Sequence, residues 1–176
     1  GQLARPYMAS DVPRPAMPAG VARLAAERAV AWSNERHVIV RTSWILGMSG
    51  PAMEPLIAAG ASGRHLPVDD LTRGTPMLAA EVAEGIVSFL AGGRYGVYHP
   101  GGGGSCTALE LARVIFRALG LPARAIPPTG ATAPRRQDAL DTRRRGAPRI
   151  RDWRLAAAAF AEAHPRGTAR AEVPAG

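Results

Sequence analysis

The chain contains no lysine, a single cysteine and few aromatic residues, and these shortages narrow the class of protein it can be. The lone Cys106 cannot form an internal disulfide, which favours a reducing compartment over a secreted scaffold. No apolar run reaches the roughly 18 residues that a membrane-spanning helix needs. The first residues are polar and rich in proline, unlike a charged and then apolar leader. We therefore expect a soluble, untargeted, cytoplasmic protein with no membrane partner.

The charge of the chain is one-sided, because its 22 basic residues are all arginines and outnumber 14 acidic residues, which gives a formal net charge of +8. A basic surface attracts phosphate-bearing partners. Aromatic residues make up only 5% of the chain, and none alternate with arginine along a strand. The stacking platform of a single-stranded nucleic-acid binder is therefore missing, and the composition argues against a nucleic-acid partner.

Several common site motifs are also missing. No G-x-G-x-x-G follows a strand and opens a helix, and we interpret the only glycine cluster, Gly101 to Gly104, as a hinge. The four histidines are scattered singly and Cys106 has no C-x-x-C partner, so we expect no metal site. Ser43 precedes a tryptophan rather than lying in a glycine elbow, which argues against a serine hydrolase.

What is present is an alternation of helical and strand patterns. Helices are predicted over residues 18–30, 52–61, 78–90, 108–119 and 151–165, and strands over residues 37–46 and 94–100. Ser105 or Thr107 is predicted to cap the fourth helix and Gly120 to close it. The β-branched run over 37–46 is typical of a strand buried on both faces. The alternation predicts an α/β fold, although these strands are too few for a freestanding doubly wound sheet.

One helix and two loops carry further expectations. The apolar residues of the helix over 78–90 share one face, which comprises Val82, Ala83, Ile86, Val87 and Leu90. We interpret Asp69 and Asp70 as part of a solvated turn rather than as paired acids. The arginines at 135–136 and 143–145 suit either a bidentate diphosphate clamp or a solvated basic loop, and the sequence leaves both open.

Read together, these segments resemble the dTDP-4-dehydrorhamnose reductase family, which are extended short-chain dehydrogenases that bind sugar nucleotides. The segments that carry the resemblance are VIVRTSWILG, RGTPMLAAEVAEGI, GVYHPGGGGSCTALELARVI, ALDTRRRG and RDWRLAAAAF, in the family's order and spacing. The resemblance implies a truncated extended short-chain dehydrogenase, that is, a remnant of a Rossmann sheet plus the small C-terminal substrate domain. It covers residues 1–165, and we expect residues 166–176 to be a disordered tail.

The departures from the family bear on its chemistry. The family's catalytic tyrosine would fall on Ala19 and its lysine on Arg23. A methyl group cannot donate a proton to a carbonyl, and arginine stays protonated and differs from lysine in reach. The resemblance also implies that this chain starts about where the family's nucleotide-binding half would end. We therefore expect no nicotinamide cofactor and no hydride transfer.

The residues that the family pattern assigns to substrate binding are only partly kept in this sequence. A family threonine is replaced by Met77, and the late Arg-Pro pair reads Arg135-Arg136. The resemblance leaves Arg41, Thr75 and Arg135 as the candidate substrate-binding residues of a weakened diphosphate-sugar site.

Three functions follow as hypotheses. The first is a non-redox protein that binds a nucleotide sugar, a related metabolite or a protein partner in a biosynthetic pathway. We expect such a protein to cover its exposed apolar face by forming a homo-oligomer or a complex with a partner protein. The second is a repurposed, cofactor-independent enzyme such as a cyclase, isomerase or dehydratase, with acid–base candidates that must line one pocket: His99, Asp70, Glu27, Tyr98 and Arg41. The third, a reductase half completed by a separate chain, is disfavoured by Ala19.

Overall fold

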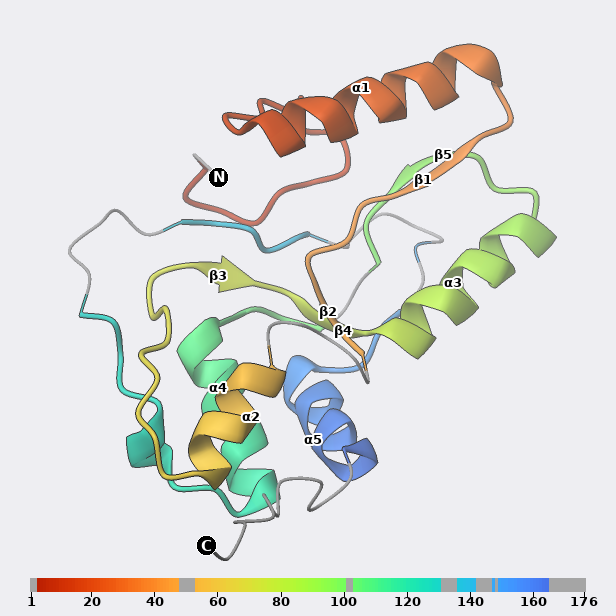
Figure 1. Cartoon of the computed structure of the whole chain (residues 1–176). Helices are drawn as coiled ribbons and strands as arrows, with labels where there is room; N and C mark the ends of the chain where they lie inside the picture. The colour runs from red at the N-terminus through yellow and green to blue at the C-terminus, as the bar shows by residue number, and fades with distance from the viewer. Residues whose placement is uncertain are drawn as a thin grey trace, which may run out of the picture.

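A computed structural model describes residues 3–47, 53–100, 103–130, 136–141, 147 and 149–164, which form a mixed α/β structure (Figure 1). The helices of these residues are α1 (Pro18–Ser33), α2 (Glu54–Ala61), α3 (Ala79–Ala91), α4 (Ala108–Leu119), the 3₁₀-helix η1 (Ala123–Ala125) and α5 (Trp153–Ala163). The strands are β1 (Val38–Val40), β2 (Trp44–Leu46), β3 (Arg73–Gly74), β4 (Pro76–Leu78), β5 (Gly96–Tyr98) and β6 (Cys106–Thr107). All five predicted α-helices are confirmed, with ends that shift by a few residues.

The strands form three separate pairs. β1 pairs with β5 and β2 with β4, both parallel, whereas β3 pairs with β6 in the antiparallel sense. The prediction of one doubly buried strand over residues 37–46 is wrong, because the chain leaves β5 after Val40 and joins β4 at Trp44. Side chains of β1 are only half-buried, and Ile45 of β2 is 48% exposed. The break between the two strands places residues 41–43 at the junction of both sheets.

The main core packs α4 against α5, with α2, β2 and η1 around them. Ile115 and Phe116 of α4 are fully buried there, and Gly60 of α2 lies so close to the Phe116 ring that an added Cβ would meet it at 2.6 Å. Thr107 begins α4 with a complete capping box, and Gly120 ends it at a left-handed φ of 72°. These caps confirm Thr107 rather than Ser105 as the predicted cap.

The opposite side of the molecule is less well covered. α1 has no buried residue along its 16 positions, and the side chain of Trp32 is 95% exposed. α3 buries Val82, Gly85 and Phe89 and leaves Val87 exposed. The apolar face predicted for this helix is therefore only partly buried. In Figure 1, α1 and α3 flank the β1–β5 pair.

The segment before α1 forms no helix or strand among the described residues apart from an isolated bridge at Tyr7, and it is tied to the chain near residue 140. Tyr7 accepts a hydrogen bond from Asp141 N at 2.7 Å and donates one to Ala139 O at 2.9 Å. Of the predicted glycine hinge, residues 101–102 lie outside the described residues, and Gly103 is buried with its carbonyl bonded to Trp153 N. The predicted tail also lies outside the described residues. No helix in the described part is both long and apolar enough to cross a membrane.

Candidate functional site

Three adjoining clefts form one trough, and the first of them is mainly apolar. This apolar cleft has a volume of about 560 Å³, and its walls include Trp44, Leu46, Met53, Leu111 and Phe160. Gly74 fixes the position of Trp44, because any Cβ at residue 74 would overlap the indole ring. Polar groups at its edge are Asp69, Thr72, Asp138 and Arg136. Such a cavity, apolar with a few polar groups, is the usual form of a small-molecule site.

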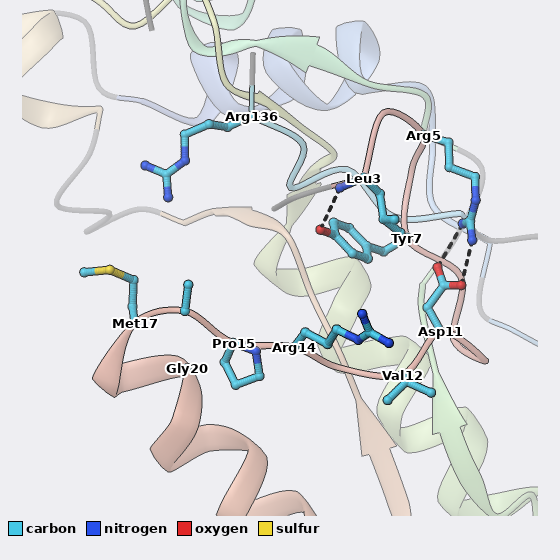
Figure 2. Close-up of a pocket in the computed structure, with 11 residues that line it drawn as sticks. Leu3, Arg5, Tyr7, Asp11, Val12, Arg14, Pro15, Met17, Gly20 and Arg136 are labelled. Carbon is cyan, nitrogen blue, oxygen red and sulfur yellow. Dashed lines mark hydrogen bonds and ion pairs between the residues drawn. The ribbon is translucent and has the colours of Figure 1, made fainter. Parts of the chain in front are cut away.

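The second cleft lies between the N-terminal segment and the start of α1, and Figure 2 shows the residues that line it. This N-terminal cleft has a volume of about 780 Å³. Arg5 and Asp11 form a two-pronged ion pair at one side, with N–O distances of 2.7 and 2.8 Å. The hydrogen bonds from Arg5, together with one from the Met8 backbone, lower the pKa of Asp11 to about 2. That carboxylate is therefore ionised and already neutralised.

Arg136 joins the apolar cleft to the N-terminal cleft, since it lines both. Within the described part of the chain its guanidinium makes no hydrogen bond or ion pair. Its charge contributes to lowering the pKa of Asp69, although hydrogen bonds from Thr72 and the Leu71 backbone contribute more. Asp69 thus closes a local turn, in agreement with the prediction, and Arg136 keeps its donors available to a ligand.

The third cleft, of about 340 Å³, continues from the second and contains the ion pair of Glu27 on α1 with Arg41 after β1. Arg41 Nε lies 3.0 and 3.1 Å from the two carboxylate oxygens of Glu27, and a terminal nitrogen lies 2.7 Å from Oε2. We call it the ion-pair cleft. Arg23 and His99 also line it. Arg41, a candidate substrate-binding residue, therefore has its charge compensated by Glu27.

His99 is almost fully buried, and its Nδ1 lies 3.0 Å from the carbonyl oxygen of Tyr7. A carbonyl only accepts, so Nδ1 carries the proton. Burial lowers the pKa of His99, against the opposing effect of the Asp141 and Tyr7 backbones. Nε2 of His99 is buried and has no hydrogen-bond partner among the described residues. His99 is thus a neutral imidazole that anchors the N-terminal segment.

The remaining candidates do not converge on the trough as free groups. The hydroxyl of Tyr98 donates to Tyr95 O at 3.1 Å while its ring packs on Phe89. Asp70 accepts a hydrogen bond from Thr129 Oγ1 at 3.1 Å. Of the five acid–base candidates, only Glu27, Arg41 and His99 share a cleft.

The substrate-binding candidates are also separated. Thr75 is buried, and its Oγ1 accepts a hydrogen bond from Leu140 N at 3.1 Å, so this hydroxyl has a structural partner. Arg135 lies outside the described residues. The sequence had marked Arg136 only as part of a basic cluster, and it had given Arg14 no role. No motif or periodicity singles out an arginine in a proline-rich segment, and only the folded chain shows that Arg14 lines two of the clefts.

Solved structures establish the class of fold, which is that of the extended short-chain dehydrogenases. A dTDP-4-dehydrorhamnose reductase of Clostridium acetobutylicum superposes with a TM-score of 0.81 at 23% identity, over 92% of this chain and 61% of that one. The enzyme of the same name from Bacillus anthracis, solved in complex with NADP, gives a TM-score of 0.78 at 24% identity, over 88% of this chain and 58% of that one. The predicted fold class is confirmed.

The chain belongs to the family described as the RmlD substrate binding domain, whose model matches residues 1–164. It is 33% identical over 190 residues to a dTDP-4-dehydrorhamnose reductase of Streptomyces griseus, covering 99% of this chain and 62% of the relative. It is 32% identical over 130 residues to a dTDP-4-keto-6-deoxy-D-glucose reductase of Streptomyces niveus, covering 72% of this chain and 45% of the relative. The chain thus spans less than two thirds of each of these relatives, and the predicted family is confirmed.

Proposed function

We propose that the chain binds a nucleotide sugar in the trough, in a biosynthetic pathway, and does not reduce it. The observation that carries this proposal is the position of Arg136, which lines both the apolar cleft and the larger N-terminal cleft and whose guanidinium has no partner among the described residues. Guanidinium groups bind phosphate oxygens in a bidentate manner. The apolar cleft would receive the base, Arg136 the diphosphate and the N-terminal cleft the sugar. The dTDP-sugar reductases among the relatives support this ligand class.

The absence of reduction rests on the start of α1. Ala19 and Arg23 occupy the positions where the resemblance expects a tyrosine and a lysine, and Ala19 lies between Met17 and Gly20, which both line the N-terminal cleft. A methyl group there has no proton to give. At the end of the parallel strand β4, α3 begins directly, without the intervening glycine loop that binds a phosphate in nucleotide-binding folds. A nicotinamide cofactor therefore does not fit the residues at hand.

A thermal-shift panel of dTDP, dTDP-glucose, UDP-glucose, NADH and NADPH tests the proposal, because a ligand that binds only the folded state raises its stability. We expect the diphosphate nucleotides to raise the melting temperature and the nicotinamides to leave it unchanged. Arg136→Gln should weaken nucleotide-sugar binding by about tenfold or more, the usual effect of losing charge-assisted hydrogen bonds. The matched control is Arg113→Gln on the exposed side of α4, outside the trough.

Either of two results would overturn the proposal. If no nucleotide raises the melting temperature, the trough is not a nucleotide site. If NADPH binds and is consumed with a dTDP-4-keto sugar, the protein is a reductase despite Ala19.

A cofactor-independent enzyme is the second candidate, favoured by the convergence of Glu27, Arg41 and His99 on the ion-pair cleft. Two of these groups neutralise each other, and the third is bonded to the Tyr7 carbonyl, which leaves few free donors for acid–base chemistry. Turnover of a bound nucleotide sugar that is abolished by His99→Asn, with binding retained, would establish this function instead.

A further inference from the structure

We propose that the nucleotide sugar bound in the trough carries a negative charge on its sugar, such as the carboxylate of a uronic acid, and that Arg14 and Arg23 bind it. This inference rests on the proposed function and names the substrate class of the same site. It is carried by two guanidinium groups at the end of the trough remote from the apolar cleft.

The charges along the trough are unevenly compensated. The N-terminal cleft is lined by Arg5, Arg14 and Arg136 against a single carboxylate, Asp11. Asp11 is fully engaged by Arg5 in the two-pronged ion pair. Arg14 and Arg136 thus face the cleft without a counter-charge from its own lining.

The ion-pair cleft has three arginines and three carboxylates in its lining, but two of the arginines have no partner among the described residues. Arg14 and Arg23 both line it, and neither side chain has a hydrogen bond or ion pair within the described residues. The Glu27 carboxylate is bonded to Arg41. The remaining acids of this cleft are Asp11, which is bonded to Arg5, and Asp138, which has interactions of its own. Within the described residues, Arg14 and Arg23 are therefore two positive side chains of one cleft without an ion-pair partner.

The position of Arg14 argues that this anion is not the diphosphate. Arg136 borders the apolar cleft and Arg14 does not. Figure 2 shows Arg136 and Arg14 on opposite sides of the N-terminal cleft, with Tyr7 between them. A diphosphate held next to the base by Arg136 leaves the sugar to extend towards Arg14. An anionic substituent of that sugar is the group that reaches Arg14 and Arg23.

A neutral sugar would leave both guanidinium groups to water and gain nothing from them. A carboxylate offers two oxygens in the plane that suits a guanidinium, and such charge-assisted hydrogen bonds are stronger than those to a hydroxyl. The structure therefore predicts selectivity for charge at the sugar, in addition to affinity for the nucleotide.

The test compares UDP-glucuronic acid with UDP-glucose, which differ only in a carboxylate in place of a hydroxymethyl group, by isothermal titration calorimetry. We expect the acidic sugar to bind about tenfold more tightly, with a preference that decreases as salt rises. Arg14→Gln and Arg23→Gln should each reduce the preference, and the double variant should abolish it, so that the two sugars bind with equal affinity. Arg113→Gln should leave the preference intact.

The outcomes separate this inference from the proposed function. Equal binding of the two sugars by the wild type, or a preference that survives in the double variant, overturns the inference and leaves nucleotide-sugar binding standing. Failure of both UDP-sugars and of dTDP-glucose to bind overturns the proposed function itself, and the inference with it.

Discussion

Four arginines around the trough differ in their partners, and this difference sets what each can do. Arg5 and Arg41 are engaged by Asp11 and Glu27, so they hold the N-terminal segment and α1 in place. Arg14 and Arg136 have no protein partner among the described residues, and they remain available to a ligand. Whether an arginine can bind a ligand therefore depends on whether its guanidinium already has a partner in the protein. The residue type alone does not show this.

His99 gives the first prediction, which concerns pH. Its pKa is lowered in the folded state, so just below pH 6.5 the unfolded chain binds a proton that the folded chain does not. Stability should therefore fall as the pH falls through this window. His99→Asn places an amide nitrogen where Nδ1 now donates to Tyr7, and it removes the titrating group. We expect urea denaturation to show a flatter dependence on pH for this variant.

The control for this prediction is His65→Asn, which makes the same substitution at an exposed histidine. If His99→Asn shows the same decline between neutral pH and pH 5 as the wild type, another group is responsible.

At the scale of elements, α1 stands apart from the rest. It has no buried residue, and a helix of 16 residues with so little packing is only marginally stable in water. The Glu27–Arg41 pair joins it to the end of β1, and both side chains are about three quarters buried. By contrast, α4 is capped at both ends and packed on α5. The helix that borders the candidate site, α1, is therefore packed much less firmly against the core than α4 is.

Glu27→Gln tests this attachment. Loss of the carboxylate leaves the largely buried Arg41 without its counter-charge, which should cost about 1–2 kcal/mol. The loss should be local, so hydrogen exchange of the α1 amides should accelerate while that of α4 does not change. Arg28→Gln, an exposed change on the next residue of α1, is the control. Uniform acceleration over both helices would mean that the ion pair supports the whole fold instead.

For the whole molecule, the exposed apolar side chains on α1 and α3 are the main feature. Val87 and Leu90 of α3 are 65% and 68% exposed, and Trp32 of α1 is 95% exposed. They flank β1 and β5, a parallel pair of only two strands, whereas parallel sheets are normally covered on both faces. This arrangement is typical of a surface that another chain or domain covers.

We expect the isolated chain to self-associate through this surface. Light scattering coupled to size exclusion should show a mass that rises with protein concentration, and Val87→Asp with Leu90→Asp should reduce it towards the monomer without lowering the melting temperature. Leu155→Asp is the control, because Leu155 is 61% exposed on α5, in another part of the structure. A wild type that stays monomeric at all concentrations would contradict the expectation.

Much of the fold followed from local signals. The helices were predictable because apolar periodicity, the Thr107 capping box and Gly120 act within a few residues. The short strands β3, β4 and β6 were not, since two or three residues carry no readable pattern. The break between β1 and β2 escaped prediction because it depends on which distant strand each half joins, β5 or β4.

The sequence by itself determined the family and the order of the helices, because both are written in residue identity and spacing. Only the tertiary structure decided which charged groups are free. Glu27 meets Arg41 across 14 residues, and Arg136 reaches the same cleft as Arg14 from more than 100 residues away. Pairing at such separations depends on how the chain folds back on itself, and no local pattern encodes it.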